Sequence, residues 1–167
     1  MKEPPRTMLT FSVGAWRFTY RVGAIVMRDG YVLLTRNLSD NYWFTPGGRV
    51  ELGESANTAI AREITEELGV TGRIERLLWT NENFFRLGET MHHELALYFL
   101  VTLPDDAHAD LSAKFACEEA DGARFEFAWH PIDKLPGIRL VPGFLTDALA
   151  NLPDTAQHIV YVDDSPL

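Results

Sequence analysis

Residues 48–70 read GRVELGESANTAIAREITEELGV, and the helix inside this stretch decides the fold. Ser55 carries a side chain that suits a helix N-cap, and Gly69 suits the position just after a helix end. The sequence therefore predicts a helix from Ala56 to Leu68. At about 100° per residue, one half of this helix combines apolar and acidic side chains. They are Ala59, Ile60, Glu63, Ile64, Glu67 and Leu68, with Glu66 at the margin.

The glutamates of this helix call for a cation. Burying unpaired carboxylates is costly, and like charges three or four residues apart repel each other. Arg62 is spaced to pair with Glu66 but lies off the apolar face, so it does not neutralise both Glu63 and Glu67. Oxygen ligands grouped on one face suit Mg²⁺ or Mn²⁺. The pattern favours a metal site over the alternative that these acidic residues only decorate a solvated helix.

The loop before the helix is rich in glycine and adds to this prediction. It contains Pro46-Gly47-Gly48, and glycines allow a backbone to approach a ligand closely. The N-terminus of the following helix favours anions. A phosphate-bearing ligand would therefore suit the junction of loop and helix.

The spacing of these residues resembles a known family. From Gly48 there are five residues to Glu54 and seven more to a run from Arg62 to Val70, which fills every fixed position of the Nudix box. Trp43 and Pro46-Gly47, just before the box, are also similar to the Nudix hydrolases. The resemblance implies the Nudix fold, an α/β/α sandwich around a mixed β-sheet.

The resemblance also implies an activity and roles for the box residues. A Nudix-type pyrophosphohydrolase would use Mg²⁺ or Mn²⁺ to cleave a phosphoanhydride bond in a nucleoside diphosphate-linked substrate, such as a nucleoside triphosphate or a nucleotide conjugate. The metal would be held by Glu63, Glu66 and Glu67 with the backbone carbonyl of Gly47 or Gly48. Arg62 would orient the carboxylates and Glu54 would support them. The predicted substrate contacts are Arg36, Trp43 and Phe85.

The general base is not fixed by the box. Glu66, Glu67, Arg62 and Glu94 form the predicted catalytic set, and Glu94 is the candidate base or extra ligand from outside the box. It opens a strand and shares a side with Ala96, Tyr98 and Leu100, so we expect its carboxylate to enter a cleft. The competing candidates are Glu118 and Glu119, in a loop from Pro104 to Gly122.

Two other functions are compatible with this type of fold. One is a catalytically silent Nudix-like module that binds a nucleotide metabolite, although such modules tend to lose box residues. The other is isopentenyl-diphosphate isomerase, which depends on a cysteine and extra ligands before the box, whereas the single Cys117 follows it. Motifs that mark several Nudix subgroups are missing, so the subfamily is left unassigned.

Composition limits the remaining classes. The 167 residues suit a single domain, and 46% hydrophobic residues are enough for a folded core. A net charge of −9 disfavours binding of nucleic acid polymers. There is no apolar run long enough for a membrane span, and we expect a cytoplasmic location. The expected partner is a small nucleotide-type substrate, and the sequence leaves a homodimer open.

Periodicity predicts the other elements. Val22 to Arg28 and Tyr31 to Thr35 are predicted to form a hairpin around Asp29-Gly30. A strand with two apolar faces is expected within Glu94 to Leu103, and a closing helix from Pro142 to Leu152. Two more strands and a flexible N-terminal arm complete the prediction. These segments are Ile74 to Phe85, Phe125 to Trp129, and residues 1–9.

Overall fold

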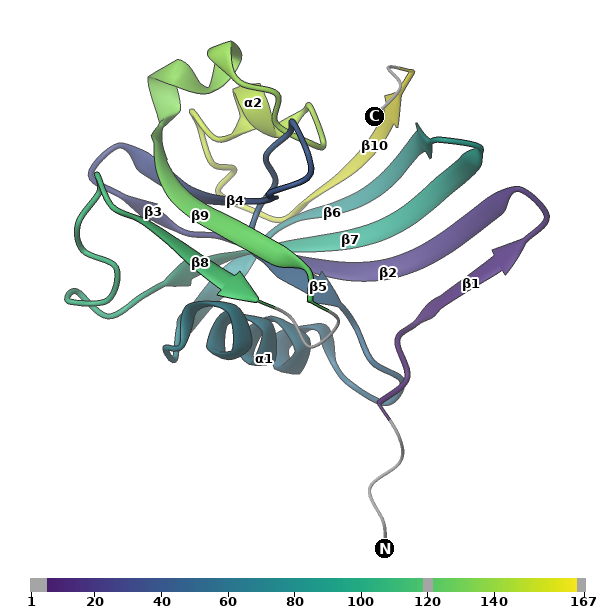
Figure 1. Cartoon of the computed structure of the whole chain (residues 1–167), viewed down its shortest axis with the longest axis horizontal. Coiled ribbons are helices and arrows are strands. Elements are labelled where there is room, and N and C mark those ends of the chain that lie inside the picture. The colour runs from purple at the N-terminus through teal and green to yellow at the C-terminus, as the bar shows by residue number, and fades with distance from the viewer. Residues whose placement is uncertain (1–5, 119–121, 165–167) are drawn as a thin grey trace, which may run out of the picture.

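A computed structural model of the chain describes residues 6–118 and 122–164. Within these ranges the strands form two sheets (Figure 1). The first has the order β1-β2-β7-β6-β10, and β5 pairs with β2. Its strands are β1 Thr10–Val13, β2 Trp16–Ile25, β5 Gly47–Arg49, β6 Arg73–Leu87, β7 Thr90–Thr102 and β10 Gln157–Asp163. The second has the order β3-β4-β9-β8, with β3 Met27–Arg28, β4 Tyr31–Asn37, β8 Lys114–Glu118 and β9 Arg124–Pro131.

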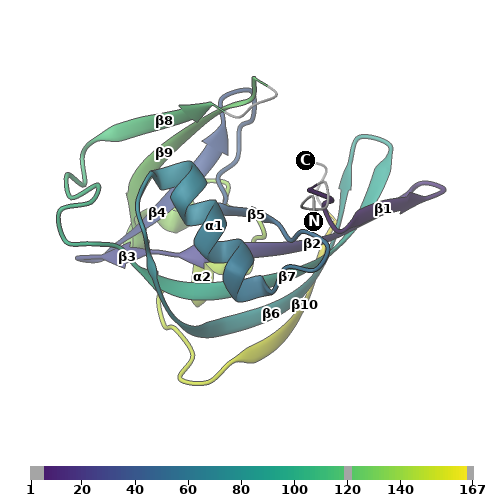
Figure 2. The same ribbon diagram turned by 90° about the horizontal axis from the view of Figure 1, so that it is seen from below.

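The first sheet is mixed, as predicted. β2 runs parallel to β7, β7 antiparallel to β6, and β6 parallel to β10. Helix α1 (Ala56–Leu68) and the short helix α2 (Leu145–Ala148) lie on opposite sides of the strands, α2 beside the 3₁₀ segment η1 (Ile132–Gly137) (Figure 1). Seen from below, α1 crosses in front of β2 and β7 (Figure 2). The mixed α/β class is therefore confirmed.

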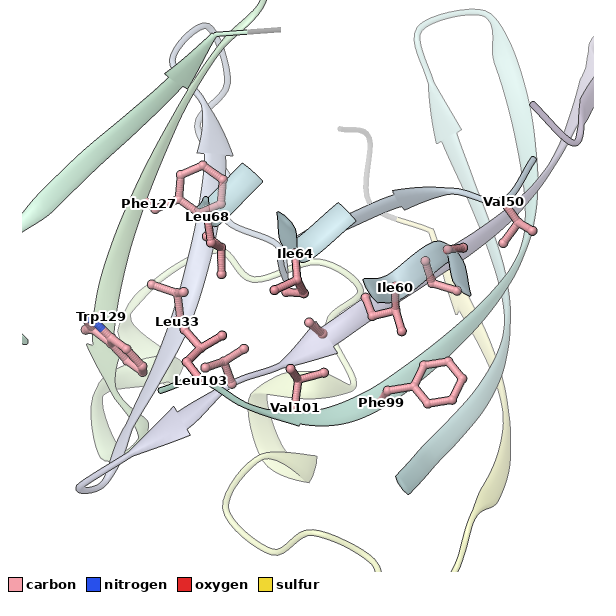
Figure 3. Packing of buried hydrophobic residues seen from close by; sticks show 14 residues of the cluster. Leu33, Val50, Ile60, Ile64, Leu68, Phe99, Val101, Leu103, Phe127 and Trp129 are labelled. Carbon is pink, nitrogen blue, oxygen red and sulfur yellow. The ribbon is translucent and has the colours of Figure 1, made fainter. Parts of the chain in front are cut away.

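Helix α1 has the predicted bounds because its cap residues act as the sequence indicates. The Ser55 side chain accepts a hydrogen bond from the Thr58 amide, and Gly69 ends the helix with φ 69°. Its apolar residues Ile60 and Ile64 point into a core between the two sheets (Figure 3). This packing fixes the rotation of α1 and with it the direction of its glutamates.

The predicted hairpin is confirmed, but the strand before it is divided. Asp29 and Gly30 have φ values of 48° and 80°, as a tight two-residue hairpin turn requires. β2 ends at Ile25 and β3 begins at Met27, so one apolar run of sequence serves both sheets. The two buried faces of β7 are also confirmed, since Phe99 packs in one core cluster and Tyr98 in the other.

The predicted helix from Pro142 to Leu152 is wrong in extent. Only Leu145–Ala148 is α-helical, although Leu145 and Leu149 are buried as the apolar pattern indicated. Gly143 lies so close to β10 that a Cβ there would overlap the hydroxyl of Tyr161. This close packing leaves the segment before α2 as turns, and a helix nucleus this short gains little from propagation.

Three further features differ from the sequence prediction. The acidic loop from Pro104 to Gly122 contains β8, which pairs with β9. β1 and β10 were not predicted, and both lie at edges of the first sheet. Part of the predicted N-terminal arm is held in place, because the Leu9 amide donates to the Val50 carbonyl and the Leu52 amide to that of Thr7. Residues 7–9 are therefore not a free arm, and residues 1–5 lie outside the described ranges.

Candidate active site

Two glutamates of α1 lie against the glycine loop. The backbone amide of Gly47 donates a 2.8 Å hydrogen bond to Oε2 of Glu67. A Cβ at Gly48 would overlap the carboxylate of Glu63, so any larger residue there would force that carboxylate to move. The β5 strand and the helix thus meet through backbone and carboxylates, at the position where the sequence predicts a site.

Arg62 connects the acidic groups around this junction. Its guanidinium donates to both oxygens of Glu54 at 2.9 and 3.0 Å, and to Glu63 at 2.7 Å. It also reaches Glu66 at 3.2 Å and the carbonyl of Arg49 at 3.1 Å. The hydrogen bond from Arg62 lowers the pKa of Glu54, and the carboxylates raise the pKa of Arg62. The planar guanidinium therefore holds the carboxylates of Glu54, Glu63 and Glu66 around it.

Glu63 and Glu54 are the two most buried of these partners. The Glu63 side chain is 12% exposed, and burial raises its pKa even though Arg62 opposes the shift. Glu66 is much more exposed, and it is shared between Arg62 and Arg6. Arg6 also pairs with Glu51 in the loop before the helix. Sequence reasoning missed Arg6, because it placed this residue in a free arm.

A cavity of about 480 Å³ opens beside the junction of β5 and α1. Gly47, Gly48 and Glu67 line one end of it. Glu94, on β7, also lines the cavity, and its side chain is 13% exposed and lies 3.4 Å from Nη1 of Arg21. The structure therefore brings Glu94 and Glu67 into one cavity together with Arg21 of β2, which the sequence analysis did not single out.

Alternation along β2 is the signal that would have found Arg21. Side chains two residues apart share a face of a strand. Arg17, Thr19 and Arg21 follow this spacing, and all three line the cavity. Arg49 from β5 is a third arginine in the cavity lining. Positive side chains are therefore concentrated in the cavity, although the chain as a whole has a net charge of −9.

The predicted substrate contacts are only partly brought together. Phe85 lines the cavity and stacks on His92, with ring centroids 4.7 Å apart. Arg36 lies over the ring of Trp43 at 4.8 Å and pairs with Glu126 at 3.0 Å. Neither Arg36 nor Trp43 is among the residues that line the cavity. The neighbours of Trp43 on either side, Tyr42 and Phe44, do line it, because successive residues of an extended chain point opposite ways.

The loop candidates for the base lie elsewhere. Glu118 ends β8, is 67% exposed and lies 4.0 Å from Arg124, and it does not line the cavity. Glu119 falls outside the described residues.

The donor set of α1 fits a divalent cation. Within residues 6–118 and 122–164, no three acidic, histidine or cysteine side chains converge into a ready-made metal cluster. The reason is visible in the contacts, since Arg62 engages Glu63 and Glu66 while Glu67 bonds to Gly47. Carboxylate oxygens from one helix face beside an open cavity are the ligands that Mg²⁺ and Mn²⁺ take. Glu63 is desolvated, so a nearby cation would stabilise its charged form.

Together, the mixed sheet, the carboxylate-bearing helix and the arginine-lined cavity define an α/β protein in which glutamates of one helix and arginines of one sheet meet at a single cavity. The chain belongs to the Nudix family, because the NUDIX domain model matches residues 17–149. None of the helices in the described ranges is long and apolar enough to cross a bilayer.

Known proteins similar to this chain carry related names. An RNA pyrophosphohydrolase of Haemophilus ducreyi is 30% identical over 124 residues, which cover 66% of this chain and 63% of that protein. The chain thus spans less than two thirds of that relative's length. The crystal structure of a UDP-X diphosphatase has a TM-score of 0.58 at 22% identity, covering 84% of this chain and 66% of the other. The mutator MutT protein of Bacillus halodurans has a TM-score of 0.59 at 17% identity, covering 87% and 92%. At these identities the two structures show the shared fold.

Proposed function

We propose that this protein is a metal-dependent hydrolase that cleaves a phosphoanhydride bond in a nucleoside diphosphate-linked substrate. A nucleoside triphosphate or a nucleotide conjugate would fit this class, with Mg²⁺ or Mn²⁺ as cofactor. The observation that carries the proposal is the junction of β5 and α1, where Glu63 and Glu67 lie against Gly48 and Gly47 at the edge of the cavity. Membership of the Nudix family and the name of the Haemophilus relative support the reaction type.

The box helix would provide the metal ligands. Glu63, Glu66 and Glu67 would hold the cation with the backbone carbonyl of Gly48. When bound, a divalent cation neutralises charge on the diphosphate and lowers the pKa of a water molecule. Arg62 acts as a positioning residue, because its hydrogen bonds to Glu54 and Glu63 set the direction of the carboxylates.

The rest of the cavity would bind and orient the substrate. Arg17, Arg21 and Arg49 offer positive charge to phosphate oxygens, although the chain as a whole is acidic. Glu94 lies in the same cavity and is our candidate to accept the proton of the attacking water. Phe85 offers an aromatic surface to the substrate, whereas Arg36 and Trp43 lie outside the cavity and are not part of the proposal.

A screen with purified protein tests this function. Nucleoside triphosphates, nucleotide sugars and dinucleotides are incubated with Mg²⁺ or Mn²⁺, and the products are identified by mass spectrometry. We expect cleavage between two phosphorus atoms, abolished by excess chelator. Glu66→Gln and Glu67→Gln should each lower turnover by at least about a hundredfold without unfolding the protein. Glu89→Gln, in the exposed β6–β7 turn, is the matched control and should behave as wild type.

Two outcomes would contradict the proposal. Unchanged metal-dependent turnover in both box variants would remove the glutamates from the site. Tight nucleotide binding with no turnover of any compound would instead indicate a binding module.

A further inference from the structure

One of the residues that line the cavity has a buried side-chain oxygen without a hydrogen-bond partner among the described residues. Asn83, on β6, is 6% exposed and lines the cavity. Its Oδ1 atom is buried and has no hydrogen-bond partner among the described residues. An unpaired buried carboxamide oxygen is costly, and most such atoms in native proteins have a hydrogen-bond partner. Its position in a cavity wall indicates that a ligand supplies the missing donor.

Asn83 belongs to a row of polar residues that crosses the sheet. In the strand register Asn83 lies opposite Glu94, and Glu94 lies opposite Thr19. Directly opposite residues have Cβ atoms about 5 Å apart on one face, so these side chains are neighbours. All three line the cavity, where β2, β7 and β6 run side by side (Figure 2). Asn83 and Glu94 therefore place a carboxamide oxygen and a carboxylate next to each other.

The next row of the same face is aromatic. His92 lies opposite Phe85, and their rings are nearly parallel, with an interplanar angle of 14°. Both line the cavity, directly beside the row that contains Asn83. A planar ring bound here would contact aromatic surface while its edge reached the carboxamide of Asn83.

We propose that this part of the cavity recognises a nucleobase that carries an exocyclic amino group, and that Asn83 is the specificity-determining residue. The inference rests on the proposed function for one point only, that the diphosphate end of the ligand lies at Glu67. An amino group provides an N–H donor to Oδ1 of Asn83, while Glu94 keeps the role proposed above toward the attacking water. The corresponding edge of uracil has one ring N–H between two carbonyl groups. One of those carbonyl oxygens would face Oδ1 of Asn83 and leave it without a donor.

The test uses nucleosides, which have no phosphoanhydride bond, in the presence of EDTA. Guanosine is compared with inosine, and cytidine with uridine, by NMR titration of the wild-type protein. The first pair differs only in the 2-amino group, and the second replaces an amino group by a carbonyl group. In each pair we expect the nucleoside with the amino group to bind at least about tenfold more tightly. The nucleoside without it leaves the buried Asn83 oxygen unpaired. A preference in one pair alone supports the proposal for that base.

Variants at position 83 assign the effect to one residue. Asn83→Leu keeps a similar volume without polar atoms, and we expect the affinity ratio within each pair to fall to about 1. Asn83→Asp keeps an acceptor and should keep the preference. Asn151→Leu, at an exposed position after α2, is the control and should leave the ratio unchanged.

The proposal is overturned by equal affinity within both pairs, by no binding of guanosine or cytidine at millimolar concentration, or by a preference that survives Asn83→Leu. The wild-type comparison decides the matter even if a variant does not fold. Since the assay involves neither metal nor hydrolysis, its outcome is separate from that of the turnover screen. A protein that binds amino-bearing bases but hydrolyses nothing would refute the proposed function and leave this inference standing.

Discussion

Glu67, in the last turn of α1, accepts a hydrogen bond from the backbone amide of Gly47, twenty residues earlier in the chain. The bond holds the glycine loop against the helix without using any side chain of the loop. It also fixes one oxygen of Glu67 and leaves the cavity side of the junction lined by backbone and carboxylate. The geometry of the site therefore depends on how closely the loop backbone can approach its neighbours.

Gly47→Ala tests this close approach. Gly47 has φ 138°, and a Cβ there would overlap the carbonyl oxygen of Val22. We expect the free energy of unfolding to fall by about 3 kcal/mol or more, from backbone strain and overpacking together. Gly88→Ala is the control, since Gly88 also has a positive φ of 58° but open space around its Cβ, and it should cost about 1–2 kcal/mol. Urea unfolding measures both, and equal losses would show that strain alone matters.

Arg62→Lys keeps the charge but loses the planar set of donors. Lysine does not reproduce the paired contacts to Glu54 together with the contact to Glu63. We expect stability to fall by about 2 kcal/mol and the affinity for Mg²⁺ to fall by about tenfold to a hundredfold. Urea unfolding and calorimetric titration with Mg²⁺ measure the two effects. A variant with wild-type stability and metal affinity would mean that the arginine geometry does not position the carboxylates.

Glu94→Gln separates the two candidate positions for the base. Glu94 lies in the cavity beside Arg21, whereas Glu118 is exposed at the end of β8. Loss of a proton acceptor should lower kcat by a factor of about 100 or more, with little change in KM. Glu118→Gln is the control, because exposed substitutions rarely change stability by more than about 0.5 kcal/mol. A selective loss of kcat in Glu118→Gln would instead move the role to β8.

His130 makes stability depend on pH. Burial lowers its pKa, Lys114 and Arg36 add to this effect, and Glu126 opposes it. Its Nε2 atom is buried without a hydrogen-bond partner among the described residues. Below about pH 6.5 the unfolded chain binds a proton that the folded protein resists, so stability should fall as the pH falls through this range. In the variant His130→Phe, the part of this pH dependence of stability that His130 causes should disappear. Urea unfolding of both proteins at pH 7.5 and pH 5.5 measures it, and identical pH dependences would contradict the assignment.

The sequence predicted the bounds of α1 correctly because the signals for this helix are local. The cap at Ser55, the end at Gly69 and the apolar period of Ile60 and Ile64 all fall within one short segment. The box spacing adds a pattern that single helices do not share. The part of the site that α1 provides could therefore be located from residue order alone.

The remainder depends on contacts between distant parts of the chain. Arg21 and Glu94 meet although they are 73 residues apart, and only the parallel pairing of β2 and β7 brings them together. β10 has alternating half-buried and exposed residues, which is a weak signal, and it is stabilised by pairing with β6. Arg36 and Trp43 were predicted to be substrate contacts, but the cation–π contact between them is made outside the cavity.

The bonds of Arg62 also bear on the order in which the protein and its cofactor come together. Because the guanidinium already offsets part of the negative charge of Glu54 and Glu63, we expect the helix to remain folded without a divalent ion. The polypeptide can complete its folding in a cell compartment depleted of such ions and acquire one afterwards. The concentration of the divalent ion would then set the fraction of folded protein that has the ion bound, while the total amount of folded protein stays the same.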